Sequence, residues 1–183
     1  EDGTLSGDVR WKPDAGAPDT AIDFKLKARS LEHFLDRMGY ANTVRRGTAT
    51  LEGQLNWNGA PFALDYPTLA GNLKLDARDG QFRKLEPGVG RLLGVISLQS
   101  LPRRITLDFR DVFSEGFAFD AIQGHARIAR GIVDTDDLEI RGPAAQVAMK
   151  GSVDLSQETQ NLTVRVQPAL GESVATGILF IHP

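Results

Sequence analysis

The chain has 183 residues and a formal net charge of −3, with 41% hydrophobic residues, 25% charged residues and no cysteine. This composition excludes a disordered tail, and the length predicts one domain or one piece of a longer array. Because the basic residues do not cluster, we expect no nucleic-acid partner bound through phosphate neutralisation. The lack of thiols excludes disulfides, cysteine catalysis and iron–sulfur clusters. No apolar run reaches the roughly 18 to 20 residues of a membrane-spanning helix.

Alternation of apolar and polar residues recurs along the chain and predicts strands with one apolar and one solvated face. The apolar members of these runs are Leu5, Val9 and Trp11; Ile22, Phe24, Leu26 and Ala28; Ala49, Leu51, Leu55 and Trp57; Leu69, Leu73, Leu75 and Ala77; Ile105, Leu107 and Phe109; Val147, Met149, Val153 and Leu155; and Leu162, Val164 and Val166. Short connections with turn residues, such as Gly142-Pro143, are typical of an antiparallel meander.

Two further strands, about 117–129 and 132–141, alternate less regularly. In the first, the apolar parity switches between Phe119 and Ile122, which indicates a bulge or a bend. The element glycine, polar, apolar recurs at Gly53, Gly71, Gly124 and Gly151 with irregular spacing. This recurrence indicates a repeated style of strand and no strict repeat.

Helical spacing interrupts the strand pattern twice. Ser30 is placed to cap a helix whose apolar residues Leu31, Phe34, Leu35 and Met38 stand at i, i+3, i+4 and i+7, and Gly39 ends it. A second helix is predicted over 87–98, opening at a proline and ending before the Leu-Pro-Arg-Arg stretch at 101–104.

About nine half-apolar strands with only two visible helices must bury their apolar faces against something else. A second sheet about 10 Å away would make a sandwich, and a curled sheet would leave an apolar interior for a ligand. We expect a mainly β fold: a long curved antiparallel meander that forms an apolar, β-taco-like groove, with two or three short helices. Because the inward residues carry almost no polar group, the ligand would be a lipid-like chain.

The inward positions of the predicted strands are the candidate lipid-contacting residues. They are Phe24, Leu26, Leu51, Leu55, Leu73, Leu75, Ile105, Leu107, Phe117, Phe119, Val147, Met149, Val153, Leu162, Val164 and Val166. Arg103 and Arg104 could meet lipid phosphates, although two solvated charges before a strand are the more ordinary interpretation.

No motif for catalysis or metal binding emerges. Asp134, Asp136 and Asp137 form an acidic cluster, but the glycine and glutamate of a calcium loop are missing, so a solvated strand edge is preferred. The three histidines, which include His125, lack the spacing of a zinc site. Gly88-Val89-Gly90 departs from the dinucleotide-binding pattern. We therefore predict no catalytic residue, no metal and no cofactor.

The stretch from 88 to 168 contains a series of recognisable motifs. They are Gly94-Val95-Ile96-Ser97-Leu98-Gln99-Ser100-Leu101-Pro102-Arg103-Arg104-Ile105, Leu107-Asp108-Phe109, Asp111-Val112-Phe113, Gly116-Phe117-Ala118-Phe119-Asp120, Thr135-Asp136-Asp137-Leu138, Arg141-Gly142-Pro143-Ala144-Ala145 and Gly151-Ser152-Val153-Asp154-Leu155. These motifs resemble the carboxy-terminal region of a large member of the AsmA-like family. Residues 1–87 resemble it in strand style only, and the tail 169–183 is divergent or truncated.

The resemblance implies a lipid-transfer bridge of the repeating β-groove type in the Gram-negative envelope. It implies an inner-membrane anchor at an amino-terminal helix that this sequence lacks, a groove that crosses the periplasm, and transport of phospholipid towards the outer membrane and its permeability barrier. Outer-membrane components would be further partners. The family has no recognised catalytic residues. Residues 1–183 would then be a single segment of a larger groove, since nine strands give roughly 40 Å of length.

Two alternatives stay open at this stage. A structural or adhesive β-sandwich of an envelope protein would have a filled core and would bind through its loops. An envelope hydrolase with scattered carboxylates has no particular residue in its favour.

Overall fold

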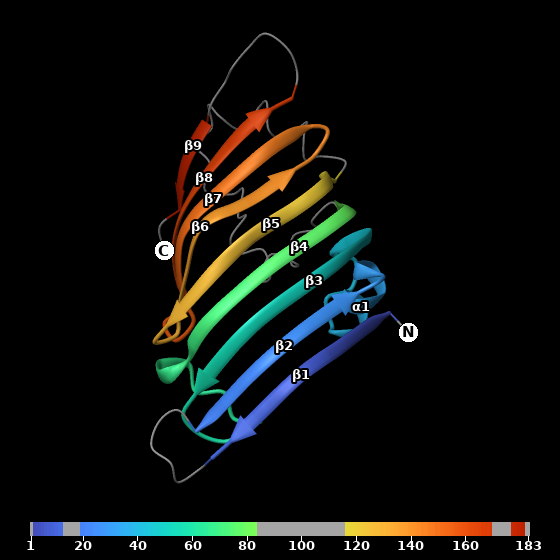
Figure 1. Ribbon diagram of the computed structural model, residues 1–183. Coiled ribbons are helices and arrows are strands. Elements are labelled where there is room, and N and C mark those ends of the chain that lie inside the picture. The colour runs from blue at the N-terminus through green and yellow to red at the C-terminus, as the bar shows by residue number, and fades with distance from the viewer. Residues whose placement is uncertain (1, 13–18, 84–115, 170–176, 182–183) are drawn as a thin grey trace.

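The computed structural model describes residues 2–12, 19–83, 116–169 and 177–181. Its strands form one antiparallel sheet in which each strand pairs with the next along the chain (Figure 1). The strands are β1 (Gly3–Trp11), β2 (Thr20–Ala28), β3 (Val44–Trp57), β4 (Ala70–Phe82), β5 (Ala118–Ala129), β6 (Ile132–Arg141), β7 (Ala145–Asp154), β8 (Thr159–Pro168) and β9 (Gly177–Ile181). The predicted antiparallel meander is confirmed, and the described strands do not form a two-sheet sandwich.

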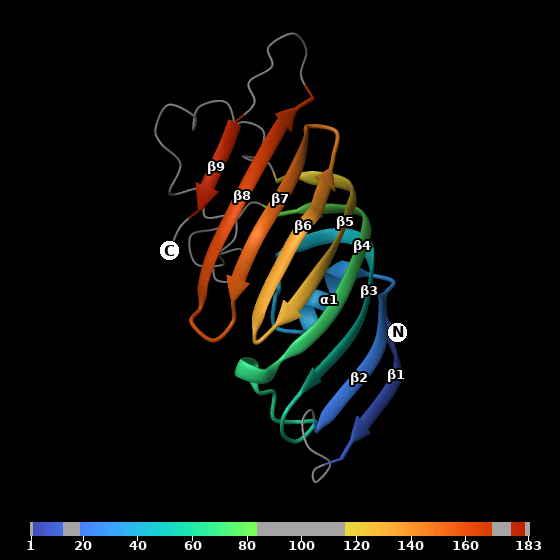
Figure 2. The same ribbon diagram turned by 60° about the vertical axis from the view of Figure 1, so that its left-hand side comes forward.

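The sheet is open and curled, with β1 at one edge and β9 at the other (Figures 1 and 2). Helix α1 (Leu31–Arg37) lies within the curl, at one end of the strands. The short 3₁₀ helix η1 (Tyr66–Thr68) lies at the other end, in the loop between β3 and β4. The predicted helix over 87–98 and the predicted strand at 105–109 lie outside the described residues.

Helix α1 begins and ends where the sequence predicts. The Ser30 side chain accepts a hydrogen bond from the backbone N–H of His33 at 3.3 Å, which satisfies one free donor of the first turn. After the last turn, the backbone N–H of Gly39 donates to the Asp36 carbonyl, and Gly39 takes a positive φ of 89°.

Strands β3 and β4 are longer than the alternation predicts because each changes parity along its length. In β3 the change occurs at Arg46 and Gly47, which have φ values of 58° and 86°, and in β4 it occurs at Asp79, which has a φ of 55°. The neighbouring β5 shows two successive buried residues, Ala121 and Ile122. These irregular positions are adjacent across the three strands. They form a line along which the strand ends bend, and the predicted parity change in β5 is part of it.

Several glycines occupy positions that a neighbouring side chain covers. A Cβ placed at Gly80 would lie 2.4 Å from the Phe119 ring, and one at Gly53 would lie 2.5 Å from a Leu73 methyl group. The Leu138 backbone and side chain cover Gly124 in the same way. Two of the recurring glycines, Gly53 and Gly124, therefore make room for leucine side chains, whereas Gly71 and Gly151 have positive φ and lie against the backbone of the paired strand.

Candidate functional site

One face of the sheet is apolar across successive strands because the register aligns the inward residues. Leu5 of β1 pairs with Leu26 of β2, Leu26 pairs with Leu51 of β3, and Leu51 pairs with Leu75 of β4. Farther along the sheet, Leu138, Met149 and Val164 continue this row on β6, β7 and β8. We call the surface formed by these rows the apolar face.

The two halves of the apolar face differ in exposure. On β1, the Leu5 side chain is 70% exposed, and the inward leucines of β2, β3 and β4 are half-buried. On β7 and β8, by contrast, Met149 is only 6% exposed and Leu162 only 4%. Among the described residues, the apolar surface that a ligand could reach therefore includes the leucines of β1–β4.

Helix α1 sits on a row of small residues at one end of this face. Gly3, Ala28, Ala49 and Ala77 pair in register across β1–β4. A Cβ at Gly3 would lie 3.1 Å from the Phe34 ring of the helix, and Leu31 and Leu35 pack against the cluster that contains Ala77. Small residues let the helix approach the sheet closely, which closes this end of the face.

Charged side chains hold α1 in place. The Glu32 carboxylate accepts a hydrogen bond from the Arg46 backbone N–H at 2.8 Å and forms an ion pair with Arg83. Asp2 forms an ion pair with Arg37 at 2.8 Å. The hydrogen bond from the Arg46 backbone, and then that from Arg83, hold the pKa of Glu32 below its ordinary value of 4.5.

We expect Glu32→Gln to lower the melting temperature at pH 7, because the charge that pairs with Arg83 is lost. A carboxyl whose pKa is lowered on folding contributes stability above pH 4.5, and this contribution is lost as the pH falls through the folded-state value. The difference between wild type and variant should therefore shrink on acidification. Calorimetry from pH 7 to pH 3 tests this, with Glu158→Gln in the β7–β8 turn as control. A difference that stays constant with pH would contradict it.

The opposite end of the apolar face is closed by a second cluster. Trp57 at the end of β3 packs with Leu69 and Ile128, and its indole N–H donates to the Ala60 carbonyl at 3.1 Å. Leu55 and Leu73 pack against this cluster from β3 and β4. The face is thus bounded by α1 at one end of the strands and by Trp57 at the other.

The other face of the sheet is polar and charged. Lys25 on β2 forms an ion pair with Glu52 on β3, and this hydrogen bond lowers the pKa of Glu52. Asp76 accepts hydrogen bonds from Arg78 and, at 2.7 Å, from Gln123 of the next strand. The hydrogen bond from Arg78 is the main reason why the pKa of Asp76 is lowered, and the hydrogen bond from Gln123 adds to this effect. These pairs, two between neighbouring strands and one within β4, are formed by charged and polar side chains on the face opposite the apolar face.

The predicted lipid-contacting residues lie together on the apolar face wherever the structure describes them. This holds for Phe24, Leu26, Leu51, Leu55, Leu73, Leu75, Phe117, Phe119, Val147, Met149, Val153, Leu162, Val164 and Val166. Ile105, Leu107, Arg103 and Arg104 lie outside the described residues. The contact of any of these residues with lipid stays a prediction.

The sequence analysis included Phe119 of β5 among the candidates but left out four other inward residues of β5 and β6. Ile122, Ile128, Leu138 and Ile140 belong to the same apolar clusters. The pairing register of β6 shifts between Thr135 and Leu138. The two residues at 136–137 occupy the place of one, which interrupts the alternation of inward and outward side chains. The signal in the sequence was the change of apolar parity across the two acidic residues at 136–137.

The acidic cluster at 134–137 is part of this bulge. The Asp137 carboxylate accepts hydrogen bonds from the backbone N–H and the ring Nδ1 of His125, each at 2.7 Å, and the backbone bond is the main reason why the pKa of Asp137 is lowered. No group of three or more potential metal ligands occurs among the described residues. The carboxylate thus has a structural partner on the polar face.

No helix within the described ranges is long and apolar enough to span a membrane. The family model described as YhdP protein matches residues 1–182. The chain is 32% identical over 177 residues to the intermembrane phospholipid transporter YhdP of Escherichia coli (strain K12). That match covers 96% of this chain and 14% of the relative's length.

No solved structure matches the chain. The family match confirms the resemblance seen in the motifs of residues 88–168 and extends over nearly the whole chain. The chain belongs to the YhdP protein family.

Proposed function

We propose that this chain is one segment of a periplasmic lipid-transport bridge that carries phospholipid between the inner and the outer membrane and supports the outer-membrane permeability barrier. The observation that carries the proposal is the apolar face, whose rows cross successive strands while the opposite face is charged. A conduit for acyl chains needs this combination and needs no reacting group. The proposal therefore includes neither an enzymatic activity nor a cofactor.

Acyl chains would lie against the accessible half of the apolar face. Leu5, Leu26, Leu51 and Leu75 form its central row. Each methylene group removed from water contributes about 0.8 kcal/mol. The predicted lipid-contacting residues on β5–β8 would line the continuation of the conduit. Contact of Arg103 and Arg104 with the lipid headgroup stays a prediction.

Among the described strands, β1 is paired on one side only, and this edge supports the proposal of a segment within a longer sheet. The backbone N–H of Arg29 donates to the Asp2 carbonyl and that of Lys12 to the Asp19 carbonyl, so even-numbered residues of β1 bond to β2. The backbone groups of Leu5 and Val9 therefore point away from β2, and both side chains are exposed. Another strand paired here would extend the sheet and cover these residues.

The relative supports the choice of cargo and compartment. It is named an intermembrane phospholipid transporter, and this chain corresponds to 14% of its length. Phospholipid is therefore the proposed cargo, the periplasm the proposed location, and an inner-membrane anchor elsewhere in a longer protein the proposed attachment. Outer-membrane components are proposed as further partners.

The proposal predicts that Leu73→Asp strongly reduces phospholipid transfer. Leu73 is a half-buried member of the apolar face, and a carboxylate there would oppose a hydrocarbon chain. We expect transfer of a fluorescent phospholipid between vesicles to fall by at least about tenfold. Asn72→Asp adds the same charge one residue away on the exposed, opposite face and should leave transfer unchanged.

Circular dichroism should verify that the Leu73→Asp protein is folded. Leu5→Asp, with Ser6→Asp as its control, offers a second test at a position whose side chain is 70% exposed. Equal transfer by all four variants and wild type would contradict lipid binding on this face.

A further inference from the structure

The loop between β3 and β4, residues 58–69, presents large apolar side chains to solvent. Phe62 is fully exposed, and Leu64 and Tyr66 are also exposed. Only one residue of the loop is charged, Asp65, and its carboxylate lies 2.5 Å from the Thr68 hydroxyl oxygen. Several large apolar side chains exposed together in one loop mark a candidate surface for interaction.

The base of this loop is held by hydrogen bonds, which fixes the position of the tip. The backbone N–H of Asn58 donates to the Thr68 hydroxyl at 2.9 Å. The backbone N–H of Gly59 donates to the Asp19 carboxylate at 2.8 Å, and the Gly59 carbonyl accepts from the Thr20 hydroxyl at 2.6 Å. The exposed side chains are therefore displayed by an ordered base.

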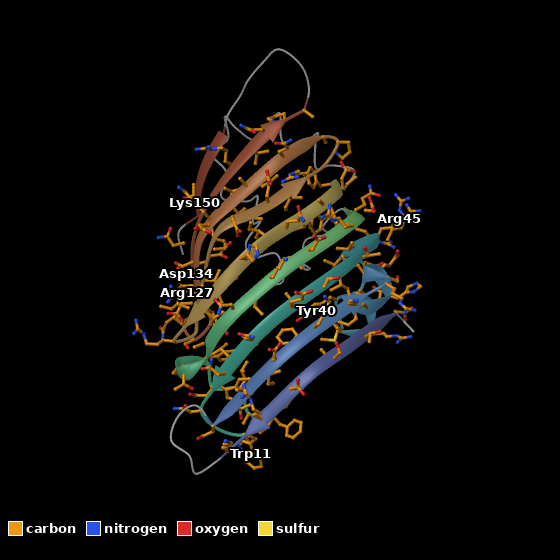
Figure 3. The ribbon with its side chains drawn as sticks, in the orientation of Figure 1. Trp11, Tyr40, Arg45, Arg127, Asp134 and Lys150 are labelled. Atoms are coloured by element: carbon orange, nitrogen blue, oxygen red, sulfur yellow. The ribbon has the colours of Figure 1, made fainter. Side chains whose placement is uncertain are left out.

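Other residues at the same end of the sheet add an aromatic ring and positive charge. Trp11 ends β1, pairs with Thr20 and is exposed (Figure 3). Lys12 follows it, is exposed, and donates its backbone N–H to the Asp19 carbonyl. On the other side of the loop, the exposed Arg130 precedes Gly131, whose backbone N–H donates to the Leu69 carbonyl at 2.9 Å.

We propose that this loop tip, Phe62, Leu64 and Tyr66 together with Trp11, docks on the surface of a phospholipid bilayer, with Lys12 and Arg130 facing its anionic headgroups. Tryptophan and tyrosine favour the boundary between hydrocarbon and headgroups, and the two basic residues complement anionic lipid. The tip adjoins the Trp57 cluster at the end of the apolar face. Docking here would hold one side of the proposed lipid path against a membrane. The purpose of docking therefore rests on the proposed function, but the test of docking does not.

The test is flotation of the 183-residue chain with vesicles of phosphatidylethanolamine and phosphatidylglycerol. We expect wild type to float, and the double variant Phe62→Ser, Leu64→Ser to lose at least about tenfold in bound fraction, since two apolar side chains no longer insert. Met38→Ser is the matched control because Met38 is also exposed but lies at the α1 end of the sheet. Lys12→Gln with Arg130→Gln should weaken binding to these vesicles more than binding to phosphatidylcholine alone.

A second readout uses the two tryptophans of the chain. Brominated phospholipid should quench the emission of exposed Trp11 but not that of buried Trp57, and Trp11→Phe should remove the quenching. The Leu73→Asp variant should still float, so loss of lipid transfer and loss of docking are separable. Equal flotation of wild type and the loop double variant would overturn the inference. Flotation of wild type in the absence of vesicles would also overturn the inference. The same holds if the loop double variant loses self-association but binds vesicles as wild type does.

Discussion

Met149→Asp is expected to unfold the protein or to lower its melting temperature by more than about 10 °C. The Met149 side chain is 6% exposed and stands between Leu138 and Val164 on the neighbouring strands. A carboxylate there would be buried without a partner, which costs about 4 kcal/mol or more of unfolding free energy.

The control for this substitution is the next residue along β7. Lys150 is exposed on the polar face, so Lys150→Asp should change the melting temperature by only a few degrees. Thermal unfolding followed by circular dichroism compares the two variants. Similar melting temperatures for Met149→Asp and Lys150→Asp would show that the apolar face of β7 is not buried in solution.

Gly71→Ala is expected to lower the free energy of unfolding by about 3 kcal/mol or more. Gly71 has a φ of 149°, and a Cβ there would lie 1.9 Å from the Gln54 carbonyl oxygen of the paired strand. Because that neighbour is backbone, the clash can be relieved only by moving β3 away from β4. Chemical denaturation of the variant measures the loss.

Gly39→Ala separates backbone strain from the steric clash. Gly39 also has a positive φ, 89°, but a Cβ placed on it would meet no other atom within 4 Å. The substitution should therefore cost only about 1 kcal/mol. If the two variants are equally stable, the close approach of β3 to Gly71 does not exist in solution.

The fold could be predicted from the sequence because it depends on local periodicity. Alternation such as Phe24, Leu26 and Ala28 assigns each residue to a face, and short turns leave only an antiparallel neighbour for each strand. The first helix was equally predictable, since Ser30 and Gly39 mark its ends. These signals require no knowledge of distant contacts.

Other features depend on contacts between strands that no single stretch of sequence contains. The bends of β3 and β4 become intelligible only when Gly47 and Asp79 are seen on neighbouring strands. The bulge in β6 hid Leu138 and Ile140 because it breaks the alternation. The difference in exposure between Leu5 and Met149 also cannot be obtained from periodicity, since both residues alternate equally well.

The loop at 58–69 illustrates the same limit. Its exposed phenylalanine resembles any core residue in the sequence, and no alternation assigns it to a face. The hydrogen bonds at Gly59 and Thr68 show that the loop is anchored. The exposure of its large apolar side chains shows that the tip points to solvent. A surface of this kind is defined by what the fold leaves uncovered.

The central claim is that the apolar face of β1–β4 binds phospholipid. Native mass spectrometry with solvent extraction, on the chain purified gently from a bacterial periplasm, tests it most directly. We predict that wild type and Asn72→Asp carry phospholipid, and that folded Leu73→Asp does not. A folded wild type that carries no phospholipid, or a Leu73→Asp protein that carries as much as wild type, would contradict the claim.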